Sequence, residues 1–488
     1  MTKKVEIRRL KTGVPGLDEL LGGGLAEFSF NLIAGVPGSG KTTLAHQIMF
    51  ALATPERPAL FFTILGEPTI KMLRYQQQYD FFDLSKVGDC IHFVNLADEA
   101  MTGDFDKVLE RIVNEMTLRN PAYVMVDSFR SVVQAMHAGG PATDLRLFVQ
   151  RLGMHLTSWQ ATSFLIGEYL ALETEANPIF TVADGILWMT QNMLGNSMVR
   201  KIQIAKMRGH ASIPGQHTFR IGNDGIRVFP RILPQTSTRF DGVAGGGNDG
   251  GPAVAERLSM GVPVLDEMMG GGLPPGYSLL VAGPSGSGKS QLAVAFLAAG
   301  VAAGERGVIA AFEKTPRRAH KVQLDRLIAS GDVGVVDTRA LDLSTDETLY
   351  ALTDLIERTG AKRVVIDSLS GFELSLSPMF REDFRESLHR MVAVLTGMGV
   401  AVLLISELED RYTDLRFSPY GAAFLTDAII VQRYVELQGR LERVLAVVKV
   451  RNSAHSHELR TFQITDEGIV IGASIPGVEG LLSGHPRR

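Results

Sequence analysis

The chain has 488 residues, about three times the length of a common single domain, so we expect at least two globular units. Hydrophobic residues make up 45% of the sequence and charged residues 21%, a balance that is typical of folded domains and excludes a disordered chain. The formal net charge of -4 and the single cysteine exclude a globally basic nucleic-acid-binding protein, a disulfide framework and a cysteine-rich zinc module.

The amino-terminal segment, residues 1–11, is charged rather than apolar. Nowhere does the sequence contain an apolar run of roughly 18 residues, the length needed to cross a bilayer. We therefore expect neither a signal peptide nor a membrane span. A lone cysteine is typical of proteins from a reducing compartment, so we expect a cytoplasmic protein.

The chain carries one pattern twice. Residues 13–25 read GVPGLDELLGGGL, and residues 261–273 repeat them without a gap as GVPVLDEMMGGGL. The match continues through later segments, so the sequence predicts two homologous domains. We place these domains at residues 1–233 and 257–488. Residues 234–256, rich in Gly, Pro, Ser and Asp, have little to pack and form the expected linker.

Short aliphatic runs alternate with longer helix-compatible segments in both copies. This alternation is typical of parallel strands joined by helices, so the sequence predicts an α/β fold with two tandem, mainly parallel sheets flanked by helices. Each sheet should be buried on both faces. The expected strands are residues 28–34, 59–65, 91–94, 123–126 and 163–166, followed by 277–282, 307–312, 333–336, 363–366 and 400–405.

Each copy contains the pattern G-x-x-x-x-G-K-[ST] between an expected strand and an expected helix. In such a loop the backbone N–H groups surround phosphates, the next helix points its positive end at them, and the lysine reaches the outer phosphates. Because both matches fall in the same register, we predict ATP binding in both copies. The predicted nucleotide-binding residues are Gly35, Pro37, Gly38, Ser39, Gly40, Lys41, Thr42 and Thr43 in the first copy, and Gly283, Ser285, Gly286, Ser287, Gly288, Lys289, Ser290 and Gln291 in the second.

A magnesium ion that accompanies ATP needs oxygen ligands from the protein. The hydroxyl of Thr42 or Ser290 can supply one of them. Two apolar strands end at Asp127 and Asp367, and an aspartate in that place lies beside the phosphate loop in such sheets. We therefore predict that Thr42 and Asp127 hold magnesium in the first copy, and Ser290 and Asp367 in the second.

Hydrolysis needs a carboxylate that aligns and polarises the attacking water. Glu313 directly follows the expected strand 307–312 and is the candidate catalytic residue, with an ordinary surface turn as the alternative. The matching position of the first copy is Leu65, and Glu67 follows about 7 Å further along an extended chain. We predict Glu67 as a substitute that leaves the two sites kinetically unequal. Glu168 and Glu407 follow further strands, either as phosphate sensors or as structural residues.

Late in each copy two basic residues stand one residue apart: Lys206 with Arg208, and Lys449 with Arg451. Alternation along a strand places both side chains of a pair on one face. Such a pair can neutralise a transferred phosphate, and from a neighbouring subunit it would act as an arginine finger. The alternative is a solvated strand edge that discourages aggregation.

The phosphate loops, the GGGL segments before them and the K-x-R pairs after them together resemble the KaiC family of RecA-like ATPases. The resemblance covers nearly the whole chain. It implies tandem RecA-like domains in a homohexamer, with ATP at the subunit interfaces. It also implies that Lys206, Arg208, Lys449 and Arg451 contact the neighbour's nucleotide, and that a signalling protein is a further partner.

Members of this family that drive circadian clocks phosphorylate an adjacent serine and threonine in their second domain. Here the corresponding positions, before Thr426 and Asp427, are Ala423 and Phe424, which have no hydroxyl. We therefore favour a slowly hydrolysing regulatory ATPase without this phosphorylation pair. Three alternatives stay open: an autokinase that uses Thr426, a RecA-like nucleic-acid motor, against which the net charge of -4 argues, and a scaffold that only senses ATP.

Overall fold

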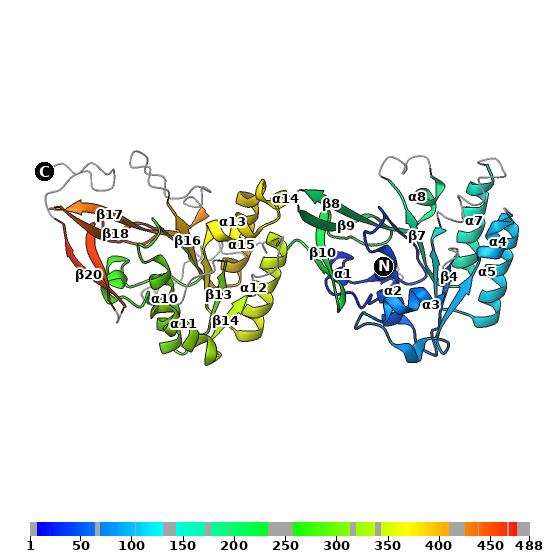
Figure 1. Cartoon of the computed structure of the whole chain (residues 1–488), viewed down its shortest axis with the longest axis horizontal. Coiled ribbons are helices and arrows are strands. Elements are labelled where there is room, and N and C mark those ends of the chain that lie inside the picture. The colour runs from blue at the N-terminus through cyan, green and yellow to red at the C-terminus, as the bar shows by residue number, and fades with distance from the viewer. Residues whose placement is uncertain are drawn as a thin grey trace, which may run out of the picture. The chain divides into compact units, whose positions relative to one another are not determined.

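The computed structural model divides into two compact units, Met1–Arg231 and Ile232–Arg488, which we name unit 1 and unit 2 (Figure 1). It describes residues 7–63, 69–102, 104–129, 143–170, 177–194, 196–232, 257–312, 319–336, 343–408, 425–437, 439–465 and 468–475. The expected linker, residues 234–256, lies outside the described residues. In the described part of the chain, no helix is long and apolar enough to cross a membrane.

Unit 1 is built on a nine-stranded sheet in the order β11-β10-β9-β8-β3-β7-β6-β4-β5. The parallel part consists of β3 (Phe30–Gly35), β4 (Ala59–Thr63), β5 (Ile91–Asn95), β6 (Tyr123–Asp127), β7 (Thr162–Glu168) and β8 (Gly185–Leu194). An antiparallel extension consists of β9 (Ser197–Met207), β10 (Gln216–Gly222) and β11 (Gly225–Phe229). A separate short pair joins β1 (Arg9–Leu10) to β2 (Leu25–Ala26).

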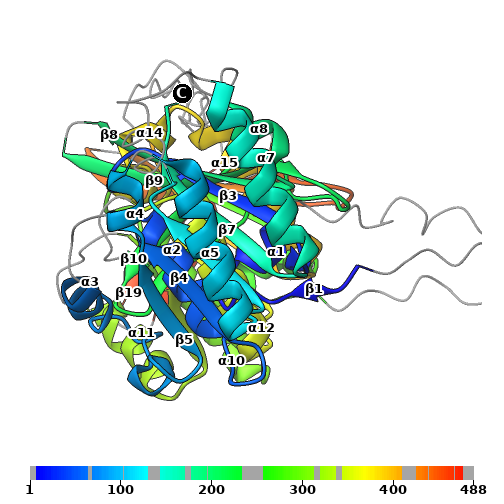
Figure 2. The ribbon, with the colours of Figure 1, turned by 90° about the vertical axis from the view of Figure 1, so that its right-hand side faces the viewer.

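Helices cover both faces of this sheet. On one face, α5 (Phe105–Arg119) and α7 (Thr143–Ser158) lie side by side and pack against β3, β4 and β6 (Figure 2). On the other face, α1 (Leu17–Leu20) and α2 (Lys41–Leu52) pack against a second apolar cluster. Among the described residues of unit 1, the remaining helices are α3 (Thr69–Gln76), η1 (Leu84–Lys86), α4 (Ala97–Met101) and α8 (Pro178–Val182).

Unit 2 repeats the topology strand for strand, in the order β14-β13-β15-β16-β12-β17-β18-β19-β20. Its parallel strands are β12 (Ser278–Gly283), β13 (Gly307–Ala311), β14 (Val333–Val336), β15 (Arg363–Asp367), β16 (Ala401–Glu407) and β17 (Ala428–Leu437). Its antiparallel strands are β18 (Arg440–Val450), β19 (Arg460–Thr465) and β20 (Gly468–Ser474).

The helices of unit 2 also form two layers. On one face α12 (Thr345–Thr359), α13 (Leu369–Ser375) and α15 (Phe384–Gly397) pack against the sheet. On the other face lie α9 (Pro263–Met268), α10 (Lys289–Ala302) and α11 (Ala319–Ala329). The short helix α14 (Pro378–Arg381) completes the unit.

The predicted fold class is confirmed: both units are mainly parallel sheets between helical layers. Each of the ten expected strands is present, with both ends within two residues of the prediction. Every residue of the central strands β3 and β12 is buried, as expected for a sheet that is covered on both faces.

Candidate functional site

Each phosphate loop joins the central strand of its sheet to a helix. β3 leads into α2 and β12 leads into α10, so each helix directs its amino terminus at the loop. Gly40 and Gly288 begin these helices with φ of 99° and 106°. A Cβ atom at Gly40 would lie 2.7 Å from Cδ1 of Ile221, and one at Gly288 would lie 2.8 Å from Cδ1 of Ile464. The left-handed backbone conformation therefore favours glycine at both positions, whereas the isoleucine side-chain ends can move to admit a Cβ atom.

The loop lysines are folded back over their own loops. Lys41 Nζ donates a hydrogen bond to the carbonyl oxygen of Val36 at 2.8 Å, and Lys289 Nζ donates to that of Pro284 at 2.8 Å. Burial lowers the pKa of Lys41, while the carboxylates of Glu168 and Asp127 act in the opposite direction. Each ammonium group therefore lies over the loop that is predicted to hold phosphate.

The predicted magnesium ligands of unit 1 lie in direct contact. Thr42, in the first turn of α2, donates a hydrogen bond from Oγ1 to Asp127 Oδ2 at 2.6 Å. Burial raises the pKa of Asp127, whereas the Thr42 hydrogen bond and the Lys41 charge lower it. A hydroxyl beside a carboxylate supplies only oxygen ligands, which fits the preference of magnesium. In unit 2, Ser290 and Asp367 occupy the same places on α10 and β15.

A second carboxylate lies beside each phosphate loop. Glu168 at the end of β7 is paired in register with Gly35, and Glu407 at the end of β16 is paired with Gly283. Glu407 Oε1 lies 4.0 Å from Lys289 Nζ. These carboxylates thus lie next to the loop lysines at the carboxyl edge of each sheet.

The two loops differ in the hydrogen bonding of their buried serines. Ser287 Oγ donates to Gln432 Oε1 at 3.1 Å. In unit 1 the place of Gln432, next to the first glycine of the loop, is taken by Met189. Ser39 Oγ is buried and has no hydrogen-bond partner within the described structure. Sequence matching did not reveal this difference, because Gln432 and Met189 lie far from the loop motif.

The K-x-R pairs lie at the opposite end of the central strand from the phosphate loop. Lys206 is near the end of β9, opposite the start of β8, and Asp184 is hydrogen-bonded through its backbone to Phe30, the first residue of β3. The loop begins at Gly35, the last residue of β3, about 17 Å away along an extended strand. In unit 2, Asp427 and Ser278 repeat this arrangement. The structure therefore does not bring either pair to the phosphate loop of its own unit.

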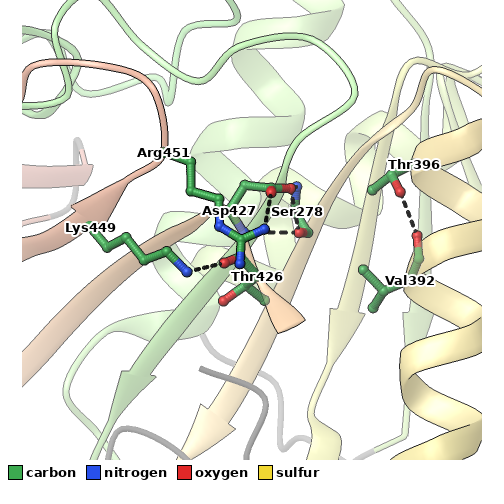
Figure 3. A network of polar contacts seen from close by, with 7 residues as sticks. All are labelled: Ser278, Val392, Thr396, Thr426, Asp427, Lys449 and Arg451. Carbon is green, nitrogen blue, oxygen red and sulfur yellow. Dashed lines mark hydrogen bonds and ion pairs between the residues drawn. The ribbon is translucent and has the colours of Figure 1, made fainter. Parts of the chain in front are cut away.

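In unit 2 the pair is instead bound to the two residues that directly precede β17, as Figure 3 shows. Lys449 Nζ donates to the carbonyl oxygen of Thr426 at 2.6 Å, and Arg451 Nη1 lies 3.2 Å from Asp427 Oδ1. Burial lowers the pKa of Lys449, the Arg451 charge lowers it further, and Asp427 acts in the opposite direction.

Unit 1 has the same arginine–aspartate contact, but its lysine is bound to the helix α8 instead. Lys206 Nζ donates to the carbonyl oxygens of Phe180 at 3.2 Å and Thr181 at 2.9 Å, and Arg208 Nη1 lies 3.1 Å from Asp184 Oδ1. The two aspartates are functional candidates to which the sequence analysis gave no role. The available signal was their recurrence immediately before the same strand in both copies.

The candidate catalytic residues Glu313 and Glu67, together with Leu65, lie outside the described residues. Ala423 and Phe424, which fill the phosphorylation positions, lie outside them as well. Thr426 is described, and its side chain is fully buried.

Comparison with known proteins agrees with the duplicated architecture. The family model described as "ATPase: KaiC" matches residues 10–232 and again residues 258–475. The circadian clock oscillator protein KaiC of Rippkaea orientalis is 26% identical over 509 residues, covering 99% of this chain and 92% of its own length. The circadian clock protein KaiC3 of a Synechocystis species is 26% identical over 500 residues, with 98% of this chain and 95% of its own length covered. This chain therefore belongs to the KaiC family of ATPases, with two tandem KaiC domains covering nearly its whole length.

Proposed function

We propose that this protein is a slowly hydrolysing regulatory ATPase that assembles as a homohexamer with ATP at the subunit interfaces. The observation that carries the proposal is the separation of each phosphate loop from the K-x-R pair of the same unit. A head-to-tail ring presents two different faces of each subunit to its neighbours. In such a ring Lys206 and Arg208, or Lys449 and Arg451, reach the nucleotide that the neighbouring subunit holds.

Within each site the loop residues bind the phosphates, and the hydroxyl–carboxylate pair holds magnesium. Thr42 and Asp127 take this role in unit 1, in agreement with their contact at 2.6 Å. Ser290 and Asp367 take it in unit 2. Magnesium would supply positive charge between the outer phosphates, while the loop lysine neutralises their other side.

The two units have different roles in ATP binding and hydrolysis. Glu313 follows its strand directly and activates the attacking water in unit 2, whereas Leu65 fills that place in unit 1 and Glu67 is displaced along the chain. Unit 1 therefore binds ATP mainly to hold the ring together, and unit 2 hydrolyses it. The nucleotide state changes the assembly or the surface offered to a signalling protein.

Separate Lys41→Ala and Lys289→Ala proteins test this division. Lys289→Ala should lower ATP turnover at least about tenfold and leave the hexamer intact, because it removes the phosphate charge partner of the hydrolysing site. Lys41→Ala should weaken hexamer formation, with turnover retained at protein concentrations that keep the ring assembled. Lys362→Ala, an exposed lysine of unit 2, is the control. Hydrolysis that depends only on Lys41 would contradict the proposal.

Autophosphorylation of the clock type is not part of the proposed function. The adjacent hydroxyls are replaced by Ala423 and Phe424, and Thr426 is fully buried. Intact-mass spectrometry after incubation with magnesium and ATP should show no added phosphate. A mass gain of one phosphate would revive the kinase alternative.

A nucleic-acid motor is also disfavoured, since the net charge of -4 supplies no general attraction to phosphate backbones. Hydrolysis should therefore not respond to added DNA or RNA. The only cysteine, Cys90, is buried, which is compatible with a cytoplasmic location.

A further inference from the structure

Each K-x-R arginine is paired with an aspartate of its own unit, and the arginine is the more exposed partner. The side chains of Arg451 and Asp427 are 49% and 24% exposed, and those of Arg208 and Asp184 are 61% and 31% exposed. A guanidinium group carries five N–H donors in one plane, so a contact to one carboxylate oxygen uses only part of its hydrogen-bonding capacity. The arginine can keep its aspartate and meet a further anion.

The aspartate itself is held firmly by the central strand (Figure 3). Its second oxygen, Asp427 Oδ2, accepts hydrogen bonds from the backbone N–H of Ser278 at 3.0 Å and from its hydroxyl at 2.8 Å. The backbone N–H of Asp427 donates in return to the carbonyl oxygen of Ser278 at 2.9 Å, and that of Arg451 donates to the carbonyl oxygen of Asp427 at 2.9 Å. The carboxylate is therefore held by contacts that do not involve the arginine side chain.

Unit 1 has a simpler version of this arrangement. Asp184 Oδ2 accepts a hydrogen bond from the backbone N–H of Phe30 at 3.1 Å. Phe30 stands where unit 2 has Ser278, so no hydroxyl is available at this place. The carboxylate that faces the arginine is consequently held by one more donor in unit 2 than in unit 1.

We propose that Asp427 is a positioning residue that orients Arg451 toward the phosphates of ATP on the neighbouring subunit, and that Asp184 does the same for Arg208 with less restraint. This inference rests on the proposed function, in which the pairs act across the interface. A mobile arginine side chain loses rotamer entropy when it is fixed. An arginine that is already oriented loses less of it on meeting the phosphate, and keeps its charge aligned as the transferred phosphate moves.

The test compares Asp427→Asn, Arg451→Ala and the double variant as full chains, measured for ATP turnover and hexamer content. Arg451→Ala should lower kcat about a thousandfold or more, the scale of an arginine finger. Asp427→Asn should lower kcat about tenfold with little change in KM for ATP, because misorientation costs more in the transition state than in binding. The double variant should match Arg451→Ala, since the aspartate acts only through the arginine.

Two further variants keep the test independent of folding damage. Ser278→Ala removes the hydroxyl donor to Asp427 and leaves the backbone N–H as the donor from this residue, as for Asp184 in unit 1. We expect kcat to fall about two- to threefold with the hexamer intact. Asp354→Asn breaks an exposed ion pair with Arg358 on α12 and should leave kcat unchanged. A normal kcat in Ser278→Ala would overturn the inference even if Asp427→Asn failed to fold.

The outcomes separate the inference from the function on which it rests. If Arg451→Ala retains normal turnover, the basic pair does not act across the interface and the proposed function fails. If Arg451→Ala loses turnover but Asp427→Asn does not, or if the two effects multiply in the double variant, only the positioning role is overturned.

Discussion

Units 1 and 2 share a backbone frame but surround it with different side chains. The strand order is the same, and both loop lysines donate to a loop carbonyl oxygen at 2.8 Å. The polar neighbours differ. Ser287 is hydrogen-bonded to Gln432, whereas Met189 occupies the matching position in unit 1. Asp427 accepts a hydrogen bond from the Ser278 hydroxyl, whereas Phe30 at the matching position in unit 1 has no hydroxyl. The lysine contacts of the loop belong to the shared frame and are the same in both units, whereas the neighbours of the buried polar groups have diverged.

The two copies differ in their buried polar side chains near the phosphate loop. In unit 1, both ring nitrogens of His46 and the hydroxyl of Ser39 are buried without hydrogen-bond partners within the described structure. The position of His46 on the helix after the loop is Val294 in unit 2. In unit 2, Ser406 Oγ and Gln432 Nε2 are likewise buried without hydrogen-bond partners in the described part of the chain, so both units leave polar groups unpaired near the loop, but not the same ones.

The largest expected difference between the units is in hydrolysis. Glu313→Gln keeps the shape of the side chain but removes the carboxylate that activates water, so turnover should fall about 10²-fold or more. Glu67→Gln in unit 1 should change turnover less than about twofold, since this glutamate is displaced from the catalytic position. Steady-state phosphate release measures both.

Nucleotide binding provides the control for this pair of variants. ATP should still bind to Glu313→Gln, because the phosphate loop is unchanged, and equilibrium dialysis would show it. A loss of turnover in Glu67→Gln with normal activity in Glu313→Gln would reverse the proposed division between the units.

The sequence was sufficient to predict five of the six parallel strands of each sheet, but not β8 and β17. Strands such as Phe30–Gly35 and Ser278–Gly283 are mostly apolar runs beside a glycine-rich loop, and their neighbours recur at similar spacing in both copies. The antiparallel half was not predicted as a set of strands. Its members, for example Arg440–Val450, mix exposed charged residues with buried ones, and a bulge in their pairing breaks the alternation.

The candidate site was predictable where its residues belong to a contiguous motif, as with Lys41 and Thr42. Its surroundings were not, because they depend on pairing between distant strands. Gln432 reaches Ser287 across a strand register that the sequence does not state, and Asp427 meets Ser278 from 149 positions away. The opposite placement of the K-x-R pairs likewise follows from the antiparallel return of β9 and β18.

Acid should destabilise unit 1 more than unit 2. Burial against Phe61 and Phe93 lowers the pKa of His46 to about 3, from an ordinary value near 6.5. Between these values the unfolded chain binds the proton and the folded chain does not, so stability is complete above about pH 6.5 and falls as the pH is lowered toward 3. At pH 5 the loss amounts to about 2 kcal/mol. His46→Val should remove this part of the pH dependence.

Fluorescence can follow unit 1 alone, because both tryptophans, Trp159 and Trp188, belong to it. Urea unfolding of the His46→Val and native chains at pH 8 and pH 5 should therefore give a smaller decrease in unfolding free energy for the variant. An equal decrease in both proteins would mean that His46 is not the acid-sensitive group.

The smallest expected effects concern the loop serines. Ser287→Ala deletes the donor to Gln432 and leaves the amide oxygen buried without it, so unit 2 should lose about 1 kcal/mol or slightly more. Ser39→Ala deletes a hydroxyl without a partner, so unit 1 should lose less than about 0.5 kcal/mol or gain stability.

Hydrogen exchange of α10 reports the first change, and tryptophan fluorescence in urea reports the second. Installing the missing partner by Met189→Gln should then make unit 1 resemble unit 2, and Ser39→Ala in that background should cost about 1 kcal/mol. Equal costs of Ser39→Ala with and without the glutamine would mean that the two loops differ in something other than this hydrogen bond.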